Sequence, residues 1–133
     1  MRRKKPELLV PASSLEVLKT AVLYGADAVY IGGEMFGLRA KAHNFDRTDM
    51  ETGIAFAHEN GVKVYVTVNI VAHNADMKGV ETYLHELKEI RPDALIISDP
   101  GIFTLARQIA PELDVHISTQ ANNCNYGTYR FWH

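Results

Sequence analysis

The stretch KVYVTV, residues 63–68, decides the fold that the sequence predicts, because its two faces differ in chemistry. Val64, Val66 and Val68 share one side of an extended chain, whereas Tyr65 and Thr67 share the other. A strand in an open parallel sheet is covered by helices on both faces, so both faces are expected to be apolar. A strand in a (β/α) barrel packs one face against the outer helices and turns the other toward the lumen. The pattern therefore favours the barrel over an open doubly wound sheet.

The same division recurs farther along the chain. Val115 and Ile117 share one side of another short run, and His116, Ser118 and Gln120 share the other. Segments of helical periodicity separate the β-branched runs, and strict alternation of this kind implies parallel strands joined by right-handed crossovers. The expected strands are residues 8–10, 28–31, 63–68, 94–98 and 115–118, and a fifth helix is expected to begin near residue 128.

Two helices carry the Ser/Thr-x-x-Glu pattern of a capping box at their start. Ser13 precedes Glu16 by three residues, and Thr48 precedes Glu51 in the same way. We therefore expect Ser13 and Thr48 to be the N-cap residues of the first and second helices.

The length of the chain suits one domain but not a whole barrel. A complete eight-stranded barrel takes about 250 residues, with a lower limit of about 200, whereas this chain has 133. The predicted fold is therefore α/β: a partial (β/α) TIM-type barrel of five parallel strands, with residues 1–133 as a single domain from the N-terminal part of a longer barrel. Open strand edges invite pairing with another chain, so we expect a homo-oligomer that covers them.

Composition excludes several classes of protein. The net charge is −2 and 23% of the residues are charged, which does not indicate a protein that coats nucleic acid or an anionic membrane. A single cysteine rules out an internal disulfide, and there is no apolar run of 18 residues or signal-peptide pattern. We therefore expect a cytoplasmic protein with no membrane partner.

The long connection at residues 37–45 is a candidate site, because ligands in (β/α) proteins bind at the carboxyl ends of the strands. It exceeds the usual two to six residues of a βα loop. Arg39 and His43 are its candidate substrate-binding residues, since a guanidinium can hold a carboxylate or phosphate with two hydrogen bonds. A surface ion pair is the alternative for Arg39.

Further candidates follow the third and fourth strands. Asn69 and His73 come after the third strand, Asn69 as a substrate contact and His73 as a general base. Asp99 comes after the fourth strand as a catalytic carboxylate, although its place before Pro100 is also typical of a helix N-cap. His43, His73 and His116 lack the local spacing of a metal motif, so no metal site is predicted.

The fifth strand runs into HISTQANNCNY, residues 116–126. Ser118 and Gln120 share the lumen side and are candidate substrate-binding residues. Cys124 is the only thiol, but a nucleophilic cysteine needs a base within reach. We interpret it as a bystander at the turn into the fifth helix.

Several stretches together resemble a known family. They are ELLVPASSLEVLKTAVLYGADAVYIGG, LRAKAHNF, GVKVYVTVNIVAHN, DALIISDPG and HISTQANNCN. The combination resembles the N-terminal part of the collagenase-like peptidases, the U-thirty-two family of unknown catalytic type. The family's motifs match this chain in four groups: Arg39, His43 and Asn44; Asn69, His73 and Asn74; Ser98, Asp99 and Pro100; and Ser118, Thr119, Gln120 and Asn122.

The resemblance implies a (β/α) barrel and leaves three functions open. The first is a fragment of a peptidase, the label that family members carry, with a peptide substrate. The second is part of an enzyme that hydroxylates RNA bases or a quinone precursor, and the third is a non-catalytic half-barrel that associates with itself. Several relatives hold an iron–sulfur cluster through cysteines beyond this region, so a cluster is implied only for a longer parent protein. We expect the chain alone to be inactive.

Overall fold

A computed structural model of the protein describes residues 5–37 and 45–133. Its described part contains one five-stranded parallel sheet in the order β1-β2-β3-β4-β5. The strands are β1 Leu9–Pro11, β2 Ala28–Gly32, β3 Lys63–Val68, β4 Ala94–Ile97 and β5 Asp114–Ile117. The helices are α1 Leu15–Leu23, α2 Arg47–Glu59, α3 Met77–Ile90, α4 Pro100–Ile109 and α5 Tyr126–Trp132, with a 3₁₀ turn, η1, at Thr119–Ala121.

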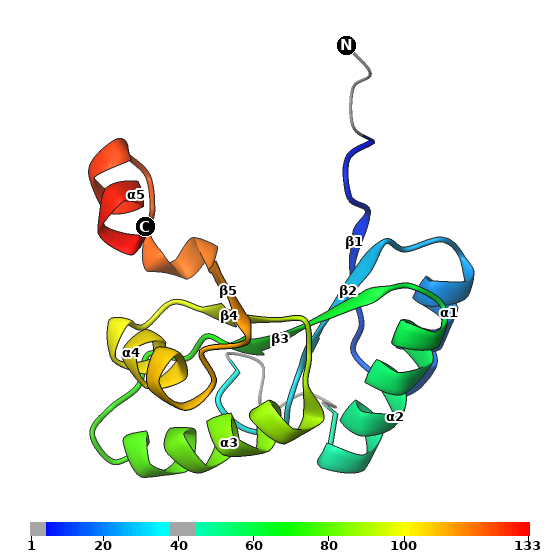
Figure 1. Cartoon of the computed structure of the whole chain (residues 1–133), viewed down its shortest axis with the longest axis horizontal. Coiled ribbons are helices and arrows are strands. Elements are labelled where there is room, and N and C mark those ends of the chain that lie inside the picture. Colours follow the sequence, from blue (N-terminus) through cyan, green and yellow to red (C-terminus); the bar gives the residue numbers. More distant parts are fainter. Residues whose placement is uncertain (1–4, 38–44) are drawn as a thin grey trace.

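The strand order distinguishes a barrel from an open doubly wound sheet. A doubly wound sheet reverses its strand order once, and that reversal places helices on both faces. Here each strand pairs with the next one along the chain without a reversal. Right-handed crossovers then place every connecting helix on the same side, and Figure 1 shows α1, α2, α3 and α4 along one side of the curved sheet. The predicted partial (β/α) barrel is confirmed.

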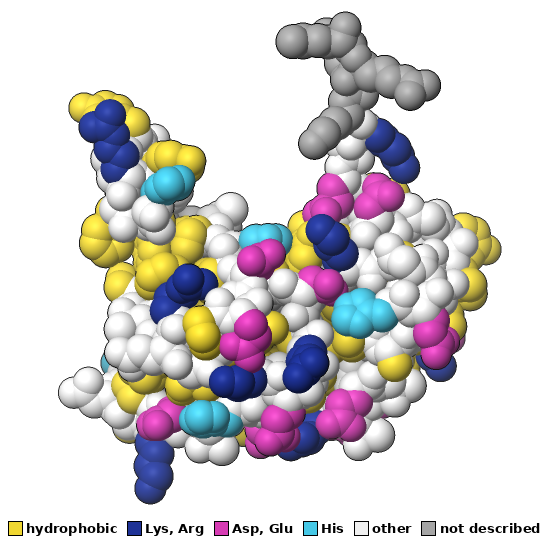
Figure 2. Space-filling view, viewed as in Figure 1, with side chains coloured by type: hydrophobic (Ala, Val, Ile, Leu, Met, Phe, Trp, Pro, Cys, Tyr) yellow, Lys and Arg dark blue, Asp and Glu magenta, His cyan; other side chains and the backbone are white. Residues whose placement is uncertain are grey.

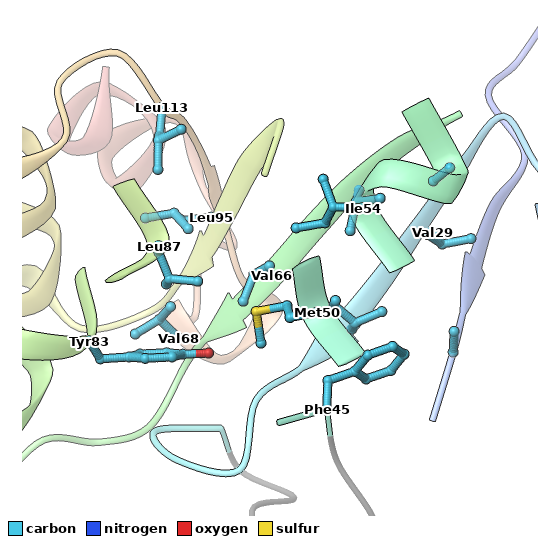
Figure 3. Close-up of a cluster of buried hydrophobic side chains, with 14 of the residues drawn as sticks. Val29, Phe45, Met50, Ile54, Val66, Val68, Tyr83, Leu87, Leu95 and Leu113 are labelled. Carbon is cyan, nitrogen blue, oxygen red and sulfur yellow. The ribbon is translucent and has the colours of Figure 1, made fainter. Parts of the chain in front are cut away.

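The two faces of the sheet bury different amounts of surface. On the helix side, Val64, Val66 and Val68 are fully buried in the main core, together with Leu95 and Ile97 of β4. Figure 3 shows part of this core, in which the Met50 side chain of α2 points toward Val66 of β3. Burial of aliphatic surface of this kind is the main favourable term in folding.

The opposite face, which we call the lumen face, carries a second and smaller cluster. Ala28, Tyr65 and Ala94 are buried there, with Tyr30 and Ile96 half-buried beside them. His116 follows on the same face and is exposed. The aliphatic side predicted for residues 63–68 is therefore the side that packs on the helices, and the other side is the lumen face.

The two predicted capping boxes are wrong by one or two residues. Ser14, not Ser13, caps α1, because its extended backbone lets its Oγ accept the Val17 N–H at 3.2 Å. Asp46, not Thr48, caps α2, and its Oδ1 accepts the Asp49 N–H at 2.7 Å. A carboxylate is a stronger acceptor for helix N–H groups than a hydroxyl, which explains why α2 begins earlier than its Thr-x-x-Glu pattern predicts.

The last helix lies at the edge of the sheet beyond β5. α5 begins at Tyr126, two residues before the predicted start, because Asn125 and Thr128 form a capping box there. Trp132 packs edge to face on Phe103 of α4 with 5.4 Å between ring centroids, while Tyr126 and Phe131 remain exposed. Figure 2 shows hydrophobic side chains on this projection and a hollow between it and the β1 end of the sheet. Within the described residues no helix has the length and apolar character needed to span a membrane.

Candidate functional site

Four polar side chains meet where β3, β4 and β5 end, and we call Asn69, Ser98, Ser118 and Gln120 the rim cluster. Asn69 Nδ2 donates to Gln120 Oε1 at 2.9 Å, and Ser118 Oγ donates to the same oxygen at 2.9 Å. Ser98 Oγ donates to the backbone oxygen of Asn69 at 3.2 Å. The cluster therefore ties three neighbouring strands together at their carboxyl ends, where ligands of (β/α) proteins bind.

The register of the sheet explains why these residues meet. Thr67, Ile96 and His116 are aligned across β3, β4 and β5. Residues two positions farther along each strand point to the same face, so Asn69, Ser98 and Ser118 follow on the lumen side. Ser118 is also held by its N–H, which donates to the Ile97 oxygen at 2.8 Å. Its side chain is largely buried, whereas Gln120 in η1 is exposed.

A second group lies deeper on the lumen face. The Tyr65 hydroxyl donates to both carboxylate oxygens of Glu7, at 3.1 and 3.0 Å. Burial of Tyr65, with the Glu7 carboxylate beside it, raises the pKa of its hydroxyl to about 12, so the phenol keeps its proton and remains a donor at neutral pH. The Tyr65 ring also contacts His116 edge to face, with centroids 4.5 Å apart. This contact holds the imidazole on the lumen face below the rim cluster.

Asp99 is the N-cap of α4, as one of its two predicted interpretations requires. Its Oδ1 accepts the Ile102 N–H at 3.0 Å, and Pro100 occupies the first helical turn. By strand alternation Asp99 continues the helix side of β4 and not the lumen side. Its catalytic role stays a prediction.

A pair of substitutions separates the two roles of Asp99. Because asparagine caps a helix as well as aspartate does, Asp99→Asn should leave stability nearly unchanged, whereas Asp99→Ala should cost about 1 kcal/mol. Urea denaturation followed by circular dichroism measures both. A loss for Asp99→Asn as large as that for Asp99→Ala would show that the carboxylate charge, and not the cap, stabilises this end of α4.

The other predicted catalytic residue, His73, stands apart from the rim cluster. It lies in the connection between β3 and α3, where its side chain is exposed and its backbone N–H donates to Asp76 Oδ2 at 2.8 Å. The described residues show no contact between His73 and Asp99, so their joint assignment as a catalytic pair stays a prediction. Of the predicted substrate-binding residues, the structure brings together Asn69, Ser118 and Gln120. Arg39 and His43 lie outside the described residues.

The described side chains form neither a cysteine nucleophile paired with a base nor a metal centre. The Cys124 thiol is exposed and donates to Asn122 Oδ1 at 3.2 Å, while His116 contacts Tyr65 instead. Among residues 5–37 and 45–133, no group of three or more His, Cys, Asp or Glu side chains is placed to hold a metal ion. One cysteine does not fit an iron–sulfur cluster, which takes several thiolates, so this chain does not supply the ligand set that its family resemblance implies for a longer protein.

Sequence reasoning missed the contribution of Glu7. Its partner Tyr65 is 58 positions away, and the chain near residue 7 has no pattern that links it to β3. The position of Tyr65 on the lumen side was the only available signal. The sequence places His116 on the lumen side with Ser118 and Gln120, but it does not indicate that the His116 ring packs on Tyr65.

The fold and the rim define a class: a (β/α) barrel protein with a cluster of polar side chains at the carboxyl ends of its strands. The chain belongs to peptidase family U32, whose family model matches residues 13–133. The solved structure of the U32 peptidase Mk0906 superposes with a TM-score of 0.63 at 18% identity, over 91% of this chain and 53% of that one. At that identity the likeness concerns the fold alone.

Curated relatives are more similar in sequence. The chain is 49% identical over 129 residues to the tRNA hydroxylation protein P1 of Bacillus subtilis, covering 97% of this chain and 31% of the relative. It is 47% identical over 131 residues to the tRNA hydroxylation protein P of Escherichia coli, covering 96% of this chain and 28% of the relative. The chain thus spans less than a third of the length of these two relatives. Their names agree with the RNA-hydroxylation alternative. The peptidase interpretation has the support of the family name and of an uncharacterized protease of Methanocaldococcus jannaschii that is 44% identical over 126 residues, covering 95% of this chain and 30% of the relative.

Proposed function

We propose that this chain, as one domain, supplies part of the (β/α) barrel of a protein that takes part in the hydroxylation of tRNA, and that its rim cluster contributes to the RNA-binding site. The observation that carries this proposal is the 49% identity to a tRNA hydroxylation protein over 97% of the chain. Similarity over that span includes every strand and every candidate residue described above. A tRNA substrate is consistent with the cytoplasmic location expected from the sequence.

The chemistry of the rim suits this role. RNA-binding proteins recognise unstacked bases by hydrogen bonds to the base edges and by stacking on aromatic rings. The rim cluster offers amide and hydroxyl groups, and the exposed His116 ring lies on the same face. The net charge of −2 provides little general attraction for phosphates, so the site depends on short-range contacts more than on long-range electrostatics.

Peptide hydrolysis has less support from the geometry. A serine or cysteine nucleophile needs a base within hydrogen-bond reach. In the described part of the chain, Ser118 Oγ donates to Gln120 and the Cys124 thiol donates to Asn122, and neither contacts a histidine or carboxylate. The proposed role in tRNA hydroxylation needs only the amide and hydroxyl groups of the rim cluster as hydrogen-bonding groups.

A chimera tests the proposal. The chimera is P1 of Bacillus subtilis in which the 129 matched residues are replaced by this chain. It is expressed in a Bacillus subtilis strain from which the genes for tRNA hydroxylation proteins P1 and P2 are deleted. Hydroxylated nucleosides in digested total tRNA are then quantified by mass spectrometry. We expect the chimera to restore a substantial part of the hydroxylated fraction that intact P1 restores. A chimera that accumulates to the level of P1, by immunoblot, and restores none of it would overturn the proposal.

We also propose that the isolated chain associates with itself. β1 and β5 are edge strands of the described sheet, and exposed edges are sites of pairing between chains. Large apolar side chains are exposed beside both edges, including Leu9 on β1 and Tyr126 and Phe131 on α5. Sedimentation equilibrium at tens of micromolar protein should give a mass well above the 14.9 kDa of one chain. A single species of that mass across the concentration range would contradict this proposal.

A further inference from the structure

We infer that Gln120 is a specificity-determining residue whose side-chain amide donates a hydrogen bond to a carbonyl oxygen of a nucleobase held above the rim cluster. The inference rests on the proposed function and deepens it, because it names the atom of the protein and the chemical group of the ligand that meet.

The orientation of the Gln120 amide is determined by its neighbours. Oε1 accepts one hydrogen bond from Asn69 Nδ2 and another from Ser118 Oγ, both at 2.9 Å. With the Asn69 amide and the Ser118 hydroxyl in these donor roles, the atom that they meet is the oxygen of the Gln120 amide, because an amide nitrogen does not accept hydrogen bonds. Two donors on the inner side therefore direct the oxygen inward and leave Nε2 on the outer side of an exposed residue.

The two neighbours are themselves fixed in place. Ser118 is 8% exposed, and its Oγ also accepts the backbone N–H of Gln120 at 3.4 Å. The backbone oxygen of Asn69 accepts the Ser98 hydroxyl at 3.2 Å. A donor that is held by groups from three strands is preorganised, so little conformational entropy is lost when a ligand binds.

The outward Nε2 group of Gln120 determines which chemical group of a ligand can bind beside it. An amide NH₂ only donates, so it favours a carbonyl oxygen and disfavours an amino group at the same place. A nucleobase offers such an oxygen on a flat ring, and the His116 ring on the same lumen face provides an aromatic surface below the rim. A peptide carbonyl would satisfy Nε2 equally well but would not use the ring. The observations therefore favour the nucleobase.

Two substitutions at Gln120 separate the outward donor from the inward acceptor. Gln120→Glu keeps an oxygen for Asn69 and Ser118 but replaces the outward NH₂ by a second oxygen. Gln120→Met has a similar length and removes both. Asn123→Asp is the matched control, because it adds the same charge three residues away on an exposed side chain that is outside the rim cluster.

The variants are placed in the chimera and read out as hydroxylated nucleoside per tRNA, with chimera abundance measured by immunoblot. We expect Gln120→Glu and Gln120→Met to lower hydroxylation at least about tenfold at unchanged abundance, as loss of one well-placed hydrogen bond predicts, and Asn123→Asp to retain it.

Retention by Gln120→Glu would overturn the inference, since only the inward acceptor would then matter. A loss in Asn123→Asp equal to that in Gln120→Glu would also overturn it, because charge alone would explain the effect. Failure of the proposed function is distinct, because the chimera without substitutions would then be inactive.

Discussion

Leu95→Ala is expected to lower the free energy of unfolding by about 2–5 kcal/mol, whereas Ile96→Ala, one position farther along the same strand, should cost about 1 kcal/mol. Leu95 is fully buried between β4 and the helices. Ile96 faces the lumen and is half-buried beside Tyr65. The cost of truncation depends on how completely the lost methyl groups were packed, so neighbours on opposite faces should differ severalfold.

Urea denaturation followed by circular dichroism measures both variants at a protein concentration where sedimentation shows a monomer. Working with the monomer matters, because the proposed self-association at the strand edges would change the measured free energy of unfolding with protein concentration. Equal losses for the two variants would indicate helices or other cover on both faces, as in an open doubly wound sheet, and would contradict the half-barrel.

Gly33→Ala is expected to be the most damaging small substitution, at about 3 kcal/mol. A Cβ at residue 33 would meet the Tyr83 hydroxyl at less than van der Waals distance, with Tyr83 Cζ at 3.1 Å and Met50 Cε at 3.2 Å. Figure 3 shows the Tyr83 ring below Val68 with its hydroxyl directed toward Met50. The end of β2 meets α2 and α3 at this point, so no single side chain can move aside freely.

A second substitution identifies the cause. The Tyr83 hydroxyl is buried and has no hydrogen-bond partner among the described residues, and burial raises its pKa far above the ordinary value. Tyr83→Phe removes an unsatisfied group, so it should be neutral or stabilise the protein by up to about 1 kcal/mol. In the double variant, Tyr83→Phe should recover part of the loss caused by Gly33→Ala, since the ring carbon and Met50 still crowd the new methyl group. Strictly additive effects in this double-mutant cycle would contradict the proposed clash.

Much of the fold was predictable because its signals are local. The alternation of Val64, Tyr65 and Val66 has a period of two residues, and a barrel strand needs that division between helix side and lumen side. The positions of Asn69 and Ser118 follow from the same parity, extended past the strand ends, whereas Gln120 lies in the turn η1, where that parity no longer holds. The placement of Asn69 and Ser118 on one side of the sheet is therefore available from the sequence.

Other features depend on backbone geometry or on distant residues. Ser13 and Ser14 are chemically equivalent as caps, and only the extended backbone of Ser14 selects it. The turn η1 changes the direction of the chain after Ser118. This change of direction allows two donors to share the Gln120 oxygen. The contact between Glu7 and Tyr65 depends on the path of the chain before β1, which brings Glu7 to the Tyr65 hydroxyl. No periodicity in the sequence reports any of these.

The amount of hydroxylated nucleoside in tRNA tests the central claim most directly. It is measured in a Bacillus subtilis strain from which the genes for P1 and P2 are deleted and in which the chimera is expressed. The same deletion strain is measured beside it, once with intact P1 and once with neither the chimera nor P1. The proposed function predicts that the chimera restores hydroxylation well above the strain with neither protein. A stably accumulated chimera whose tRNA is indistinguishable from that of the strain with neither protein would contradict it.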